Sequence, residues 1–137
     1  MRDRDRAPIA FLDKTFEETL ALAVETEGYM RSALKREARR LAPGGRLRLN
    51  LEGMRLVSRI AHVVAWLLDQ RAVRDGELTR AELCGRSAPM SDNAVCLAHD
   101  STLAGYFPPR FAILLERSQK LYLRVARLDD LMRRTAG

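Results

Sequence analysis

The stretch from Leu47 to Asp75 constrains the fold most, because it is apolar on two adjacent sides of one helix. Residues spaced three and four apart lie on one stripe of a helix. The two apolar stripes consist of Met54, Val57, Ala61, Val64 and Leu68, and of Leu56, Ile60, Val63 and Leu67. A surface helix normally has one apolar face, so two adjacent stripes predict contact with two neighbouring elements. We therefore expect this stretch to be the central helix of a bundle.

The remaining side of the central helix is polar, apart from one tryptophan. Tryptophan and arginine are enriched where proteins meet. We therefore predict protein-interface residues on this side, namely Arg55, Arg59, His62 and Trp66. The alternative for Trp66 is that it caps the core of the bundle beneath a loop. For His62, a hydrogen-bonded position at a surface or interface is the expectation.

Helical periodicity continues on both sides of this stretch. The first helix is expected at about 12–41, ending at Pro43-Gly44-Gly45, with an apolar stripe made of Phe16, Leu20, Ala23, Val24, Met30, Leu34, Ala38 and Leu41. Thr79, with Glu82 three residues later, predicts a short helix at about 79–84, with Gly85 as its stop. The last helix, at about 109–134, keeps a three-four apolar alternation with one small polar position, Ser118.

These segments predict an all-α fold, an antiparallel three-helix bundle with one short extra helix and a long loop before the last helix. The length of 137 residues suits a single domain, 1–137. The loop, residues 86–109, is long for a structureless connection, so we interpret it as a lid or a functional loop. Its apolar residues suggest that part of it folds back on the bundle: Val95, Leu97, Leu103, Tyr106 and Phe107.

The formal charge of +6 and the sequence pI near 10.0 favour acidic partners, either a nucleic acid or an acidic protein surface. The last helix has a basic stripe, which we predict to be an electrostatic docking face: Arg117, Lys120, Arg124 and Arg127. The alternative function is a basic helical bundle that binds nucleic acid. We do not expect it, because there is no helix-turn-helix pattern and Tyr122 is the sole interleaved aromatic residue. The cluster of basic residues in 31–40 is interpreted as a solvated helix end that matches the helix dipole.

Residue patterns for bond chemistry are weak. Cys84, Cys96 and His99, with His62 as a fourth group, lack the close pairing of zinc ligands, and a mobile loop is a poor place to preorganise a Cys-His pair. No phosphate-binding glycine loop, H-E-x-x-H or G-x-S-x-G motif occurs in the sequence. We therefore predict no enzyme activity and no catalytic, cofactor-binding or metal-ligating residues.

We expect neither a secretory signal nor a membrane-spanning segment. The charged N-terminus does not read as a secretory signal, and the longest apolar run, Val63 to Leu68, is too short to cross a membrane. Two cysteines fit a reducing compartment. A cytoplasmic protein without membrane insertion is the expectation.

Two segments, residues 53–79 and 114–132, resemble the alphaproteobacterial family that contains the regulator of CtrA degradation, also catalogued as a domain of unknown function (DUF1465). The pattern is E-x-M-R-L-x-x-R, then A-x-W-L-L, R-A-V-x-x-G-E-x-T and R-S-x-x-L-x-x-R-V-x-R-L-D. The matching residues are Glu52, Met54, Arg55, Leu56, Arg59, Ala65, Trp66, Leu67, Leu68, Arg71, Ala72, Val73, Gly76, Glu77, Thr79, Arg117, Ser118, Leu121, Arg124, Val125, Arg127, Leu128 and Asp129.

This resemblance implies a non-enzymatic, dimeric three-helix adaptor without a cofactor. Such an adaptor assists regulated proteolysis by the ClpXP protease, delivering cell-cycle regulators as cargo alongside other protease-associated adaptors. The sequence departs from the family in the loop at 86–109, and in ending directly after the last helix, where relatives can carry a flexible tail.

Overall fold

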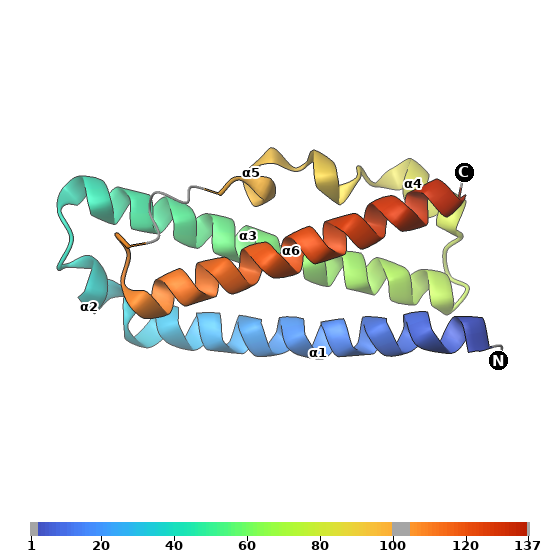
Figure 1. The fold of residues 1–137 in the computed structure, drawn as a ribbon, viewed down its shortest axis with the longest axis horizontal. Helices are drawn as coiled ribbons and strands as arrows, with labels where there is room; N and C mark the ends of the chain where they lie inside the picture. The colour runs from blue at the N-terminus through green and yellow to red at the C-terminus, as the bar shows by residue number, and fades with distance from the viewer. Residues whose placement is uncertain (1–2, 100–104, 137) are drawn as a thin grey trace.

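Three long helices form the body of the molecule (Figure 1). The structure is a computed structural model, and it describes residues 3–99 and 105–136. The long helices are α1 (Asp3–Ser32), α3 (Pro43–Arg74) and α6 (Pro109–Ala136), and each packs against the other two. No strand occurs in these two ranges, so the predicted all-α fold is confirmed.

The direction of the last helix depends on the segment before it. When three helices pack side by side, at least two of them point in the same direction. In this bundle α3 and α6 point the same way, and α1 points the opposite way (Figure 1). The chain after α3 crosses back along the bundle before α6 begins. We call residues 75–99 the return segment; it contains α4 (Arg80–Arg86), the 3-10 helix η1 (Met90–Asp92) and α5 (Ala94–Leu97).

The return segment packs against both α3 and α6. Leu83, Met90 and Cys96 are buried, while Val95 remains 57% exposed. Beyond the segment, Phe107 is buried between other aromatic rings, and its ring centroid lies 5.2 Å from that of Phe111. The expected folding back onto the bundle is therefore found, but on short helices rather than on an irregular loop. Leu103 lies outside the described residues.

The first predicted helix differs from the observed one at both ends. It begins at Asp3 rather than near residue 12, and the non-helical φ of −122° at Ala33 separates α1 from the short α2 (Leu34–Ala38). Pro43 starts α3 instead of ending its predecessor, because a proline at the first helical position loses no hydrogen bond. Ala42 before it is extended, as the residue before a proline usually is.

Local sequence explains the end of α3 and the start of α4. Gly76 adopts the left-handed φ of +78° just after α3, and such a position favours glycine. The Thr79 hydroxyl accepts a hydrogen bond from the Glu82 amide at 3.1 Å, so the predicted cap of α4 is confirmed. Gly85 lies within α4, which continues to Arg86.

The most deeply buried side of α1 lies beside the predicted apolar stripe, of which Phe16, Ala23 and Met30 are partly buried against the core. Leu20 and Val24 are 45% and 70% exposed, whereas the inward residues include three threonines: Thr15, Thr19, Leu22, Thr26 and Tyr29. Thr19 donates its hydroxyl to the Thr15 carbonyl at 2.7 Å. A threonine that is satisfied within its own helix can pack its methyl group in a core. For α6 the predicted stripe is correct, since Phe111, Leu114, Ser118, Leu121 and Val125 are all buried.

Candidate interaction surfaces

The polar side of α3 faces the return segment and α6, not solvent. Arg59 is only 2% exposed. Its Nε donates to the Cys96 carbonyl at 2.9 Å and its Nη2 to the Ala98 carbonyl at 2.7 Å. Its Nη1 donates to Ser118 Oγ at 3.0 Å and to the Leu115 carbonyl at 3.3 Å. One guanidinium thus joins α3, the end of α5 and the middle of α6.

This arrangement explains why a charged group is tolerated in the core. Carbonyls at the end of a helix have no partner within it, so those beside α5 need a donor. Burial lowers the pKa of Arg59 from its usual value, and the nearby Arg55 charge lowers it further. A guanidinium nevertheless stays protonated in proteins and supplies five donors. The prediction that Arg59 is an interface residue is wrong, because its hydrogen bonds are made inside the chain.

Trp66 is also internal, with 6% of its surface exposed. Its Nε1 donates to Asp129 Oδ1 at 3.0 Å. The other oxygen of Asp129 accepts from the Met90 amide and from Arg133 Nε, each at 3.0 Å. Trp66 therefore covers the core beneath the return segment, which is the alternative interpretation of this residue. Its predicted role as an interface residue is wrong.

Arg55 and His62 lie at the edge of the same side. Arg55 is partly buried and donates to the Glu52 carboxylate one turn earlier. His62 is exposed; its Nε2 lies 3.2 Å from the Asn93 side-chain nitrogen and its Nδ1 lies 2.8 Å from the Ser58 carbonyl. Because an amide nitrogen can only donate, Nε2 is the acceptor and Nδ1 carries the proton. Of the four predicted residues, His62 is the one that solvent reaches freely.

The tautomer of His62 also decides whether His62 and Cys96 could act as a catalytic Cys-His pair. Cys96 Sγ lies 3.8 Å from His62 Nδ1, and Cys96 is 1% exposed. A nitrogen that already holds a proton on the Ser58 carbonyl is not available as a base for this thiol. In the described ranges, no group of three or more His, Cys, Asp and Glu side chains is placed to hold a metal ion.

The apolar stripe of α3 that was expected to meet a neighbouring helix is instead on the surface, apart from Val64, which packs against the core. Met54 is 70% exposed, Val57 48% and Leu68 49%. Met54 and Leu68 belong with Leu47 and Leu51 to a row at alternating spacings of four and three, which is typical of a coiled-coil seam. Val57 lies beside this row. We call this row the α3 seam, and it consists of Leu47, Leu51, Met54, Ser58, Ala61, Ala65 and Leu68. The second stripe, from Leu56 to Leu67, forms the core contact.

Grooves lie on both sides of the α3 seam. One of about 490 Å³ runs toward α1 and α2 and is lined by Met30, Leu34, Asn50, Gly53, Met54, Val57 and Ser58. The other, of about 720 Å³, runs toward α5 and is lined by Gly44, Leu47, Arg48, Leu51, Glu52, Met54, Arg55, Ser58 and Val95. Met54 is part of both, so it stands on a ridge between two hollows, a shape that suits the side chains of a docked helix.

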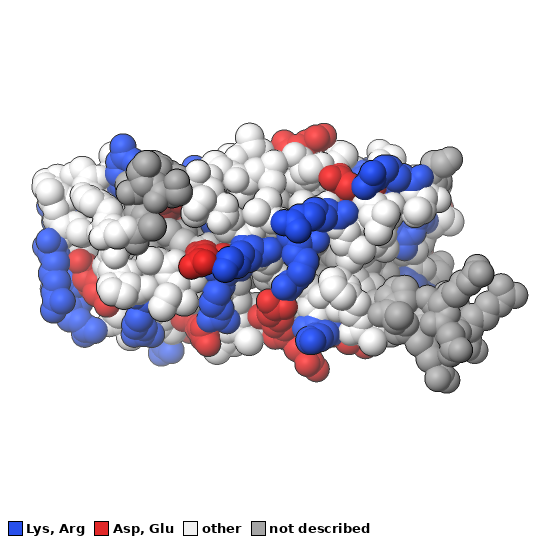
Figure 2. All heavy atoms as spheres, viewed as in Figure 1, with Lys and Arg blue, Asp and Glu red and all other residues white. Residues whose placement is uncertain are grey.

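The predicted basic face of α6 is largely paired with acidic side chains. Arg117 and Arg124 form ion pairs with Glu25 and Glu18 of α1, and Lys120 pairs with Glu116 at 2.8 Å. Arg127 is exposed. Figure 2 shows basic side chains along α6 with acidic ones beside them. Exposed pairs of this kind add little to stability because solvent screens them, but they cancel the local charge. Pairing therefore weakens the case for docking at this face.

These features define a class: an all-α protein with a closed helical core and an exposed seam suited to another helix. None of the helices in the described part combines the length and apolarity needed to span a membrane. The family described as "Protein of unknown function (DUF1465)" matches residues 4–137, and the chain belongs to this family.

A solved structure agrees with this assignment. The crystal structure of RcdA from Caulobacter crescentus CB15 is 34% identical in sequence and superposes with a TM-score of 0.70. The match covers 89% of this chain and 91% of that one. No curated protein matches the chain.

Proposed function

We propose that this protein is a non-enzymatic adaptor that assists regulated proteolysis by ClpXP in the cytoplasm. It would act as a homodimer, binding cell-cycle regulators as cargo together with other protease-associated adaptors. Membership of the DUF1465 family and the similarity to RcdA support this role. An adaptor works by raising the effective concentration of a substrate near its protease, and this requires interaction surfaces rather than a reactive centre.

The α3 seam is the observation that carries the proposal. Its first half has large side chains, Leu47, Leu51 and Met54, and its second half has the small residues Ala61 and Ala65. A two-fold axis near Ser58 would run two copies antiparallel, so that Leu51 and Met54 of one copy face Ala65 and Ala61 of the other. Leu47 and Leu68 would meet at the two ends of the contact. Such a surface is self-complementary, as a two-fold interface requires. We therefore assign the dimer contact to this seam.

Charged substitutions in the α3 seam test the dimer. The double variant Leu51→Glu with Met54→Glu is expected to be monomeric by sedimentation equilibrium, because each copy would have to bury two unpaired carboxylates against the alanines of the other. The matched control is Ile113→Glu, since Ile113 is 55% exposed on α6 and apart from the seam. A wild-type monomer, or equal dissociation of the control, would contradict the assignment.

Adaptor activity is tested separately with purified ClpXP and a fluorescently tagged cell-cycle regulator as cargo. Wild-type protein, supplied with the other adaptors, is expected to accelerate loss of fluorescence, and the seam double variant to do so less. Circular dichroism must first show that the variant keeps its helices. No acceleration by the wild type, in any combination of adaptors, would overturn the proposed function.

A further inference from the structure

The whole net charge of the protein resides in one short part of the chain. Residues 31–48 contain seven basic and one acidic residue, a net of +6, and the rest of the chain holds 17 of each. This part covers the end of α1, α2 and the start of α3. Figure 2 shows Lys and Arg gathered at the end of the molecule where these elements meet. We call residues 31–48 the basic end.

Five basic residues of the basic end have no acidic partner among the described residues. All seven of its basic residues are exposed. Its one carboxylate, on Glu37, accepts a hydrogen bond from the buried Tyr29 hydroxyl, and Arg31 pairs with Glu27 at 3.0 Å. No other ion pair to a residue within the described ranges is made by Lys35, Arg36, Arg39, Arg40 or Arg46. The basic residues of α6 differ in this respect, because three of them form ion pairs with glutamates.

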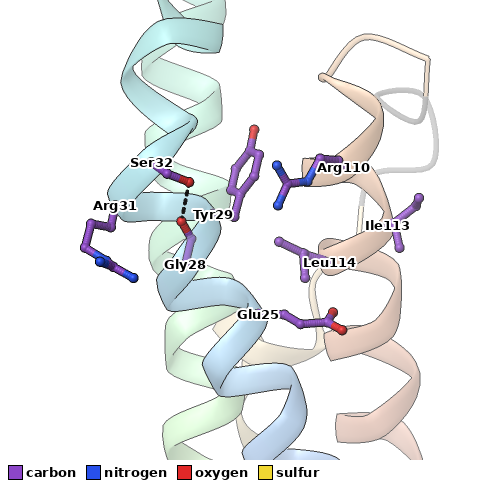
Figure 3. Close-up of a pocket in the computed structure, with 8 residues that line it drawn as sticks. All are labelled: Glu25, Gly28, Tyr29, Arg31, Ser32, Arg110, Ile113 and Leu114. Carbon is purple, nitrogen blue, oxygen red and sulfur yellow. Dashed lines mark hydrogen bonds between the residues drawn. The ribbon is translucent and has the colours of Figure 1, made fainter.

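A groove of about 650 Å³ between α1 and α6 adjoins the basic end. Figure 3 shows Arg110 reaching from α6 into the space between the two helices, where its guanidinium carbon lies 5.2 Å from the centre of the Tyr29 ring. This stacking holds the guanidinium in place while leaving its edge open. Ile113, 55% exposed, and the buried Leu114 add an apolar surface beside it.

We infer that the groove and the basic end bind an acidic segment of a partner protein, one in which carboxylates alternate with aliphatic side chains. Arg110 would take one carboxylate inside the groove, since a guanidinium binds a carboxylate through two parallel hydrogen bonds. Arg31 lies at the outer edge of the groove and would take a second carboxylate in exchange for its exposed pair with Glu27. Ile113 and Leu114 would contact the aliphatic side chains. The inference rests on the proposed function for its setting, because it names the chemistry of a partner that the adaptor would capture.

Nucleic acid fits the same groove less well. The Tyr29 ring is 0% exposed, so it offers no face on which a base can stack. The apolar patch at Ile113 also favours aliphatic groups over a sugar-phosphate backbone.

Fluorescence anisotropy with a short fluorescein-labelled peptide that alternates glutamate with leucine tests the inference. The peptide is expected to bind saturably, and the Arg31→Gln, Arg110→Gln double variant to weaken binding by about tenfold or more, since two charge-assisted contacts are lost. The control is the Arg124→Gln, Arg127→Gln variant, which changes the net charge equally at exposed positions of α6 outside the groove and is expected to weaken binding by less than about twofold. Ile113→Ser is expected to weaken it as well.

Three outcomes would overturn the inference: no saturable binding of the peptide, equal weakening by both double variants, or tighter binding of labelled single-stranded DNA than of the peptide. A second peptide with glutamine in place of glutamate must bind more weakly. The assay contains no protease, so it separates this inference from the proposed function. Peptide binding that depends on Arg31 and Arg110, in a protein without effect on proteolysis, would support the surface and contradict the adaptor role.

Discussion

At the residue scale, the side chains most typical of interfaces are used inside the chain. Arg59 and Trp66 both have long apolar parts that pack in a core and polar tips that find partners there. The partners are carbonyls near α5 and a carboxylate on α6, all brought to α3 by distant parts of the sequence. An arginine or tryptophan on a helix therefore does not by itself show whether that side of the helix is a protein interface or is hydrogen-bonded inside the chain.

Replacing Arg59 tests this internal role. Arg59→Leu leaves the carbonyls of Cys96 and Ala98 and the Ser118 hydroxyl without their donor. We expect the free energy of unfolding to fall by about 2–4 kcal/mol, measured by urea denaturation, because unsatisfied buried polar groups are costly. The control Arg127→Leu, at an exposed position of α6, should change it by less than about 0.5 kcal/mol. A similar loss of unfolding free energy in the two variants would contradict the internal role of Arg59.

At the element scale, the return segment decides how the bundle is assembled. It brings η1 and α5 across α3 and α6, and in doing so covers the polar side of α3. Its own short helices have little intrinsic stability, since a single turn costs more to nucleate than it returns in hydrogen bonds. The segment is therefore held by side chains of the long helices, chiefly Arg59 and Asp129.

Asp129 and the neighbouring Asp130 offer a matched pair of substitutions. Asp129 is 4% exposed and accepts from Trp66, the Met90 amide and Arg133, whereas Asp130 accepts from Ser91 at the edge of the segment. Asp129→Ala is expected to accelerate limited proteolysis within residues 86–99 by about tenfold, as the local opening free energy falls. Asp130→Ala should have a much smaller effect. Equal cleavage rates would show that Asp129 does not hold the segment.

At the scale of the whole molecule, we propose that the chain is a single domain that unfolds as one unit. The core is continuous from Tyr29 at one end to Trp66 toward the other, and all three long helices contribute to it. Trp66, the sole tryptophan, reports on the core by its fluorescence, while far-ultraviolet circular dichroism reports on all helices. The two urea transitions are expected to coincide. Separate midpoints would indicate that a part of the bundle unfolds independently.

Several features followed from the sequence alone. The all-α class, the central helix at 47–75, the Thr79 cap and the buried stripe of α6 all depend on spacing within one segment, and such local patterns survive in the fold. The motif residues of the central and last helices likewise identified the family to which the chain belongs.

The tertiary structure alone decided which side of α3 faces solvent. Periodicity measures the angle between two stripes of a helix, but it does not say what packs against each of them. The carbonyls that satisfy Arg59 and the carboxylate that satisfies Trp66 are supplied by residues 96–98 and by Asp129. Once those acceptors cover the polar side of the helix, Met54, Val57 and Leu68 are left outside. A side chain's environment depends on groups remote in the chain, and for that reason the interface could not be placed from the sequence.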